Sequence, residues 1–275
     1  MLTINLGEAM EKKRVLITGA GSGLGKEAAI LLAKKGYKVI GVVQYEKQQQ
    51  EIEQLAKEKE LSICSFVANI LKEEDRVKIK EENFDVIFLN AAIGETGAVC
   101  EVPISKVEAV WETNVKANLL LAQEVFAKWQ KEGREGRIVF LTSMAGRIPI
   151  PFLAPYCASK AALETFVTCF RKELKFIKDC KIQVGMIEPG SYATGFNYEN
   201  NQKMYEWMDE NSYFYRILPE LKKYQQKLWS MVEVKNFHSA VKQYVKAVED
   251  KKLKLRYTAP WYQAGIVQLG RILGM

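Results

Sequence analysis

The sequence contains a single histidine, His238, and its five cysteines form no C-x-x-C pair. A Ser-His-Asp or Cys-His hydrolase would have to use His238 as its base, but the chain has no G-x-S-x-G elbow to hold a nucleophile. The cysteines also lack the spacing of a zinc site and of a secreted disulfide framework. We therefore expect a protein with no metal and with reduced thiols, located in the cytoplasm.

Long apolar runs and concentrated charge are also missing. No stretch approaches the roughly 20 apolar residues that span a bilayer, and residues 1–14 lack the apolar centre of a signal peptide. The 40 Lys and Arg against 33 Asp and Glu leave a net charge of +7, but the basic residues are dispersed. We therefore expect a small-molecule partner, no nucleic acid and no membrane span.

Short apolar runs alternate with helical segments through the first two thirds of the 275 residues. The pattern predicts strands at residues 14–18, 37–43, 61–68, 84–90, 137–143, 181–188 and 253–257, and helices at about 24–35, 46–59, 104–129, 155–177 and 237–249. The first six strands are apolar on consecutive residues, which is typical of strands covered on both faces. The predicted fold class is α/β, a single doubly wound parallel sheet flanked by helices. Residues 259–275 are mildly apolar and receive no element.

A glycine-rich loop, T-G-A-G-S-G-L-G at residues 18–25, joins the first predicted strand to the first helix. Glycines at this position let the backbone approach a pyrophosphate, whose charge then lies at the helix N-terminus. A Walker A loop is disfavoured, because Ala20 and Glu27 stand where it needs a glycine and a hydroxyl. G-x-G-x-x-G is also absent, because Leu24 and Lys26 fill its third-glycine positions. A tight structural turn remains the alternative interpretation of the loop taken alone.

Four further residues suggest acid–base chemistry without histidine. Tyr156 and Lys160 lie one helical turn apart, Ser143 ends the fifth predicted strand, and Asn114 lies in the helical segment before that strand. A free tyrosine has a pKa near 10, and a lysine ammonium together with a cationic nicotinamide would lower that pKa toward neutrality. An ordinary amphipathic helix with Tyr and Lys four apart is the alternative, but it explains neither the glycine loop nor Ser143.

These motifs, in this order, resemble those of the short-chain dehydrogenase/reductase family over about residues 13–194. The resemblance implies a single Rossmann-type domain with seven parallel strands. It also implies hydride transfer between NAD(H) or NADP(H) and an alcohol/carbonyl pair. Tyr156 would be the general acid/base, Lys160 would lower its pKa and hold the nicotinamide ribose, Ser143 would orient the substrate oxygen, and Asn114 would hold a proton-relay water.

The same resemblance implies a set of cofactor contacts at the ends of the strands and on the catalytic helix. These are Thr18, Gly19, Ser22, Gly23, Leu24, Gly25, Gln44, Asn69, Ile70, Asn90, Ala91, Ala92, Tyr156, Lys160, Pro189, Gly190 and Thr194. Two departures stand out: the family's Asn-Asn-Ala-Gly turn is Leu89-Asn90-Ala91-Ala92 here, and Asn69 replaces a common Asp. We expect the turn to keep the family's conformation, because Asn90 and the small Ala91 remain.

The preferred cofactor is predicted from the end of the second strand. NAD-specific members usually carry an acidic residue there and NADP-specific members a nearby arginine. Here the strand ends in Val43 and Gln44, followed by Glu46 and Lys47. The absence of a carboxylate at Val43 or Gln44 and the closeness of Lys47 favour NADP(H) slightly, whereas Glu46 favours NAD(H).

The domain is expected to comprise a cofactor-binding and catalytic core at residues 13–194, a helical substrate lid at 195–233 after the sixth strand, and a last helix, strand and tail at 234–275. Nine aromatic side chains in and just before the lid predict a bulky, apolar alcohol or ketone. The alternative is that they pack the lid on the core or fill an oligomer interface. They are Tyr192, Phe196, Tyr198, Tyr205, Trp207, Tyr213, Phe214, Tyr215 and Tyr224. The apolar helical segments 104–129 and 155–177 predict a homodimer or homotetramer.

Two other functions stay open at this point. A catalytically silent nucleotide sensor would use the same fold, and a role at RNA or a membrane surface would rest on the charge of +7. The sensor interpretation is disfavoured because both Tyr156 and Lys160 are present. The second is disfavoured because dispersed basic residues usually belong to a solvated surface.

Overall fold

Seven parallel strands form one sheet in the computed structural model, which describes residues 12–274. The strands are β1 (Arg14–Thr18), β2 (Lys38–Val43), β3 (Ile63–Val67), β4 (Val86–Leu89), β5 (Gly136–Leu141), β6 (Ile182–Pro189) and β7 (Arg256–Ala259), in the spatial order β3-β2-β1-β4-β5-β6-β7. This order reverses between β1 and β4, which confirms the predicted doubly wound sheet. The expectation about a leader concerns mostly residues 1–11, and these, like residue 275, lie outside the described part.

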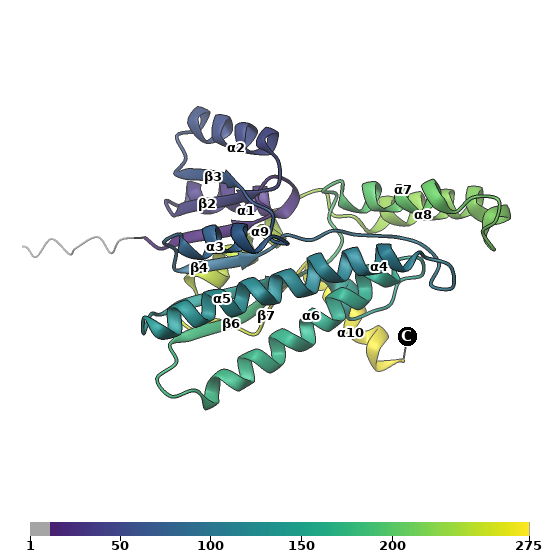
Figure 1. The fold of residues 1–275 in the computed structure, drawn as a ribbon. Helices are drawn as coiled ribbons and strands as arrows, with labels where there is room; N and C mark the ends of the chain where they lie inside the picture. The colour runs from purple at the N-terminus through teal and green to yellow at the C-terminus, as the bar shows by residue number, and fades with distance from the viewer. Residues whose placement is uncertain (1–11, 275) are drawn as a thin grey trace, which may run out of the picture.

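Helices cover both faces of the sheet (Figure 1). They are α1 (Gly23–Lys34), α2 (Glu46–Glu58), α3 (Glu73–Glu81), α4 (Ile104–Trp111), α5 (Asn118–Lys131), α6 (Ala154–Glu173), α7 (Phe196–Trp207), α8 (Leu218–Val232), α9 (His238–Glu249) and α10 (Trp261–Ile272). One apolar core lies between the sheet and α3, α5 and α6, and the other between the sheet and α1, α2 and α9. Because both faces are buried, the strands needed consecutive apolar residues.

Helices α7 and α8 extend away from the sheet on the right of Figure 1, and α10 lies below them. A small apolar cluster around the buried Met204 and Met208 packs the lid against Ala98 and Phe152. Among the described residues, no helix is long and apolar enough to cross a membrane.

Three segments differ from the prediction. The helix expected over residues 104–129 is interrupted by a π-helical turn, Glu112–Ala117, which contains Asn114. The seventh strand was placed at residues 253–257 but is Arg256–Ala259, because the buried Leu253 packs into the core from a loop and only resembled the start of a strand. The tail, for which no element was predicted, forms α10 up to Ile272.

Candidate active site

The carboxyl ends of the strands surround a cavity of about 830 Å³. In a doubly wound sheet this edge is where ligands bind, close to the point where the strand order reverses. The predicted residues that line it are Gly19, Ser22, Gly23, Leu24, Gly25, Gln44, Asn69, Ile70, Asn90, Ala91, Ala92, Ser143, Tyr156, Pro189, Gly190 and Thr194. Thr18, Asn114 and Lys160 are not among the lining residues. Each of them lies behind the wall and forms a hydrogen bond with a lining residue.

The glycine loop has the shape that a pyrophosphate requires. A Cβ on Gly25 would lie 2.4 Å from the carbonyl oxygen of Gly19 and 2.6 Å from Nδ2 of Asn90, so only glycine fits. Helix α1 begins at Gly23 with no hydrogen bond from a capping side chain and no acidic residue in its first turn. Its first backbone N–H groups therefore face the cavity without a competing anion. These features fit the pyrophosphate of a dinucleotide cofactor.

Thr18 supports the turn after β4 from behind. The backbone N–H groups of Asn90 and Ala91 donate to its Oγ1 at 2.9 and 3.0 Å. The Asn90 side chain donates to the carbonyl of Gly19 at 3.3 Å and accepts from the hydroxyl of Tyr244 at 2.6 Å. These bonds keep the turn in place despite its departures from the family pattern. Tyr244, on α9, was not among the predicted site residues.

Tyr156 and Ser143 meet at the cavity wall. Ser143 follows β5 and accepts a hydrogen bond from the N–H of Ala145 at 3.1 Å, which begins the short 3₁₀ turn Met144–Gly146. Tyr156 lies in the first turn of α6, hydrogen-bonds to the Ser143 side chain and has its ring 5.4 Å from that of Phe196. The structure thus brings together the two groups that would contact a substrate oxygen.

Lys160 lies one turn further along α6 and is 2% exposed. Its Nζ donates to the carbonyl oxygen of Leu141 at 2.8 Å and lies 5.5 Å from the centre of the Tyr156 ring. The ammonium is therefore behind the phenol rather than in the cavity. It bonds to the last residue of β5, two residues before Ser143.

The pKa values of this pair differ from the prediction. Burial raises the pKa of Tyr156 above its usual value, and the hydrogen bond with Ser143 opposes that rise only in part. Burial also lowers the pKa of Lys160 to about 7. The expected lowering of the Tyr156 pKa is thus not produced by the polypeptide, because Lys160 is bonded to Leu141 and its own charge is costly at this depth.

Asn114 is fully buried in the π-helical turn, and its side chain connects two elements of the site. Its Oδ1 accepts from the N–H of Ile93 at 2.8 Å. Its Nδ2 donates to the carbonyl of Ile93 at 2.9 Å and to Oγ of Ser159 at 3.0 Å. The loop after β4 is thereby tied to α6 beside Tyr156. A role for Asn114 in holding a water stays a prediction.

Beyond the ends of β2 and β3, Gln44, Asn69 and Ile70 line the cavity together with Gln48, which sequence analysis missed. The Gln48 side chain accepts from the N–H groups of Gln44 and Tyr45 at 3.0 and 3.3 Å. It lies against Gly21, where a Cβ would come within 2.5 Å of it. Nothing in the polar α2 sequence distinguishes Gln48 from its glutamine neighbours, so only the fold reveals it.

The remaining part of the cavity is mainly apolar. Its walls come from the loop after the 3₁₀ turn, from α8 and from α10, and include Ile148, Ile150, Leu153, Leu228, Trp229, Val232, Ile266 and Val267. Of the nine aromatic residues predicted to cover a substrate, only Tyr192 and Phe196 line it. Tyr205, Trp207 and Phe214 belong to the apolar cluster that packs the lid against Ala98 and Phe152. The other four, Tyr198, Tyr213, Tyr215 and Tyr224, are exposed. Aliphatic side chains and one tryptophan therefore supply most of the apolar wall.

Helix α10 contributes a polar contact as well, which sequence analysis also missed. Gln263 accepts from the N–H of Ser191 at 2.8 Å and donates to the carbonyl of Val232 at 2.8 Å. It connects the turn after β6 to the end of α8. Within the described residues, no group of three or more His, Cys, Asp or Glu side chains has an arrangement that could hold a metal ion.

The doubly wound sheet and a cavity lined by a glycine loop, Ser143 and Tyr156 together define the class of this protein. The sequence model of the short chain dehydrogenases matches residues 13–205. The chain belongs to the short-chain dehydrogenase/reductase family.

Individual relatives are similar over about two thirds of their length. A probable short-chain type dehydrogenase/reductase of Helicobacter pylori, VdlC, is 31% identical over 198 residues, which cover 68% of this chain and 69% of that protein. Tetrahydroxynaphthalene reductase of Pyricularia oryzae is 30% identical over 196 residues, covering 68% of this chain and 66% of that enzyme. A short chain dehydrogenase/reductase of Burkholderia phymatum, solved in complex with NAD, superposes with a TM-score of 0.79 at 17% identity, over 96% of this chain and 94% of that one.

Proposed function

We propose that the protein transfers a hydride between NAD(P)(H) and a bulky, apolar alcohol or ketone, with Tyr156 as the general acid/base. The main observation behind the proposal is the contact between Tyr156 and Ser143 in the wall of the cavity. The glycine loop lines the same cavity. A silent sensor would not need a buried lysine one helical turn behind that tyrosine.

The nicotinamide supplies or accepts the hydride when the cofactor is bound. In the reducing direction, Ser143 donates a hydrogen bond to the carbonyl oxygen, which stabilises the negative charge as it develops. Tyr156 then gives its proton to that oxygen. The raised pKa of Tyr156 keeps the phenol protonated at neutral pH, as a proton donor must be. To hold the nicotinamide ribose and to favour phenolate in the oxidising direction, Lys160 would have to exchange its hydrogen bond with Leu141 for contacts with the cofactor and Tyr156.

The chemistry of the cavity wall supports an apolar substrate. The residues beyond Tyr156 are mostly aliphatic, and α10 contributes Ile266 and Val267 at the mouth. Asn197 and Gln263 are also lining residues, and both are already engaged in hydrogen bonds with neighbouring residues. The charged lining residues in the described part of the chain are Glu112 and Glu199, with no Lys or Arg among them. An anionic substrate such as a keto acid would therefore lose its hydration there without a partner for its charge.

The cofactor and the substrate class are tested in one steady-state experiment. A bulky apolar ketone and a small charged keto acid are each assayed with NADPH and with NADH. We expect the highest kcat/KM for the apolar ketone with NADPH, because no carboxylate at Val43 or Gln44 repels a 2′-phosphate. An efficiency with NADH tenfold or more above that with NADPH would overturn the cofactor preference. Preference for the keto acid would overturn the substrate class.

We also propose that the protein is a cytoplasmic homodimer or homotetramer. The helices expected to pair are those of the segments 104–129 and 155–177, and they expose Ile104, Trp111 and Phe166. Exposed side chains of this size on two helices of the same face suit contact with a second copy.

A further inference from the structure

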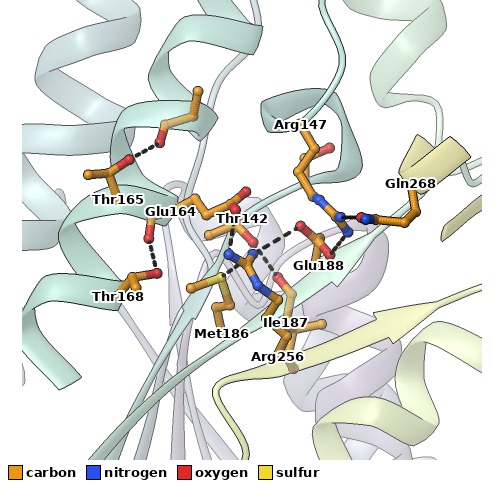
Figure 2. A network of polar contacts seen from close by, with 12 residues as sticks. Thr142, Arg147, Glu164, Thr165, Thr168, Met186, Ile187, Glu188, Arg256 and Gln268 are labelled. Carbon is orange, nitrogen blue, oxygen red and sulfur yellow. Dashed lines mark hydrogen bonds and ion pairs between the residues drawn. The ribbon is translucent and has the colours of Figure 1, made fainter. Parts of the chain in front are cut away.

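A network of largely buried charges lies directly behind residues 143–147, here called the Ser143 turn. The Glu188 carboxylate is 0% exposed, with Nη1 of Arg147 3.3 Å from one oxygen and Nη1 of Arg256 3.3 Å from the other. Arg256 also pairs with Glu164 on α6. Figure 2 shows Glu188 between the two arginines, with Gln268 approaching Arg147 from the other side. The four charged groups sum to zero, so the network is balanced without any outside ion.

Arg147 is joined to the Ser143 turn through the backbone. The N–H of Gly146 donates to the carbonyl of Ser143, and that of Arg147 to the carbonyl of Met144, both at 2.9 Å. On its opposite side the turn contacts α6, because a Cβ on Gly146 would lie 2.8 Å from the carbonyl carbon of Lys160. The turn is thus held by α6 on one side and by the Arg147 side chain on the other.

The same guanidinium also reaches the C-terminal helix. Its Nη2 donates to Oε1 of Gln268 on α10. Gln268 directly follows Val267, and α10 supplies Gln263, Ile266 and Val267 to the cavity wall. One side chain therefore contacts β6 just before Pro189 and Gly190, and also the helix that borders the substrate end.

Stability alone does not account for such an arrangement. Buried ion pairs often contribute little net free energy, because the desolvation of the charges offsets their attraction, and apolar replacements of similar size can be as stable. The planar guanidinium has N–H donors at fixed angles. When two partners bind these donors, they restrict the position of the arginine side chain and of the backbone that bears it.

We propose that Arg147 is a positioning residue that fixes the Ser143 turn. Through Arg147, the position of the turn depends on the position of helix α10. The ion pair with Glu188 holds the guanidinium in place. The hydrogen bond with Gln268 connects the guanidinium to α10, so that a movement of α10 would shift it. The kinetic part of this inference rests on the proposed oxidoreductase function. The structural part, that Arg147 holds the Ser143 turn in place, does not depend on that function.

The test compares Arg147→Met with Arg256→Met. Both variants remove one arginine from the same carboxylate, but Arg256 does not contact the Ser143 turn. We expect Arg147→Met to lower kcat about tenfold to a hundredfold, with little change in the dissociation constant for NADPH measured by fluorescence. We expect Arg256→Met to stay within about threefold of wild-type kcat, and Arg147→Lys to recover part of the loss.

Two further readouts make the result decisive. Gln268→Leu should lower kcat in the wild-type background but add nothing in the Arg147→Met background, because both changes act through one contact. Amide hydrogen exchange of residues 145–147 should accelerate in Arg147→Met and not in Arg256→Met. Equal kcat in the two arginine variants, or additive effects of Gln268→Leu, would overturn the proposal. A wild-type protein with no turnover would refute the proposed function, whereas the exchange data would still decide whether Arg147 holds the turn.

Discussion

Replacing Tyr156 with phenylalanine is expected to lower kcat by about two to four orders of magnitude, the usual contribution of a general acid–base group. The variant lacks one oxygen atom and keeps the ring that packs 5.4 Å from Phe196. The fold and the affinity for NADPH should therefore stay close to wild type. The measurements are steady-state kcat for reduction of an apolar ketone, NADPH binding by fluorescence, and the thermal unfolding midpoint.

Tyr205→Phe provides the matched control. The hydroxyl of Tyr205 also makes a side-chain hydrogen bond, at 2.8 Å to Gln225 in the lid, but it is not part of the cavity wall. Removing it should leave kcat close to wild type. Near-wild-type turnover by Tyr156→Phe, with a substrate that the wild type reduces, would end the assignment of Tyr156 as the proton donor.

Replacing Lys160 with methionine is expected to remove a pH dependence of stability. The pKa of Lys160 is lowered from 10.5 to about 7 in the folded protein. Below pH 7 the lysine is protonated in both states and the cost of burying its charge is fully present. Between about pH 7 and 10.5 only the unfolded chain keeps the proton, so the free energy of unfolding rises with pH, by at most ~1.4 kcal/mol per pH unit.

The measurement is the difference in unfolding free energy between wild type and Lys160→Met, from denaturant titrations without added cofactor. All other titrating groups are common to both proteins, so the difference isolates Lys160. It should shift in favour of wild type as the pH rises from 7 to 10. Lys172→Met, which replaces an exposed lysine on the same helix, is the matched control. A constant difference for Lys160→Met would mean that the lysine keeps its ordinary pKa.

The local sequence contains most of what determines the fold and the cofactor end of the site. Consecutive apolar residues mark the buried strands, and the glycine loop must follow the first of them for backbone and cofactor to meet. Ser143, Tyr156 and Lys160 were found because their spacing places them at one sheet edge. The structure confirms that Ser143 and Tyr156 come together there.

The parts that escaped prediction depend on contacts between distant segments. Gln48 and Gln263 have ordinary polar neighbours in the sequence, and only the folded chain brings them to the cavity. Helix α10 was missed because its apolar residues are interrupted by Gly265 and Gly270. For the lid aromatics the sequence leaves substrate contact, packing of the lid and an oligomer interface open. In the structure three of them pack the lid against Ala98 and Phe152, and four are exposed.

The central claim is hydride transfer at this cavity, and deuterium labelling tests it most directly. Wild-type protein is incubated with a bulky apolar ketone and NADPH that carries deuterium at both C4 positions, and the product is analysed by mass spectrometry and NMR. One ketone, one NADPH and one proton should yield one NADP⁺ and one alcohol with a single deuterium on its carbinol carbon. The Tyr156→Phe protein should form this product at least about a hundredfold more slowly. Tight NADPH binding with no deuterated alcohol from any of several bulky apolar ketones would contradict the account.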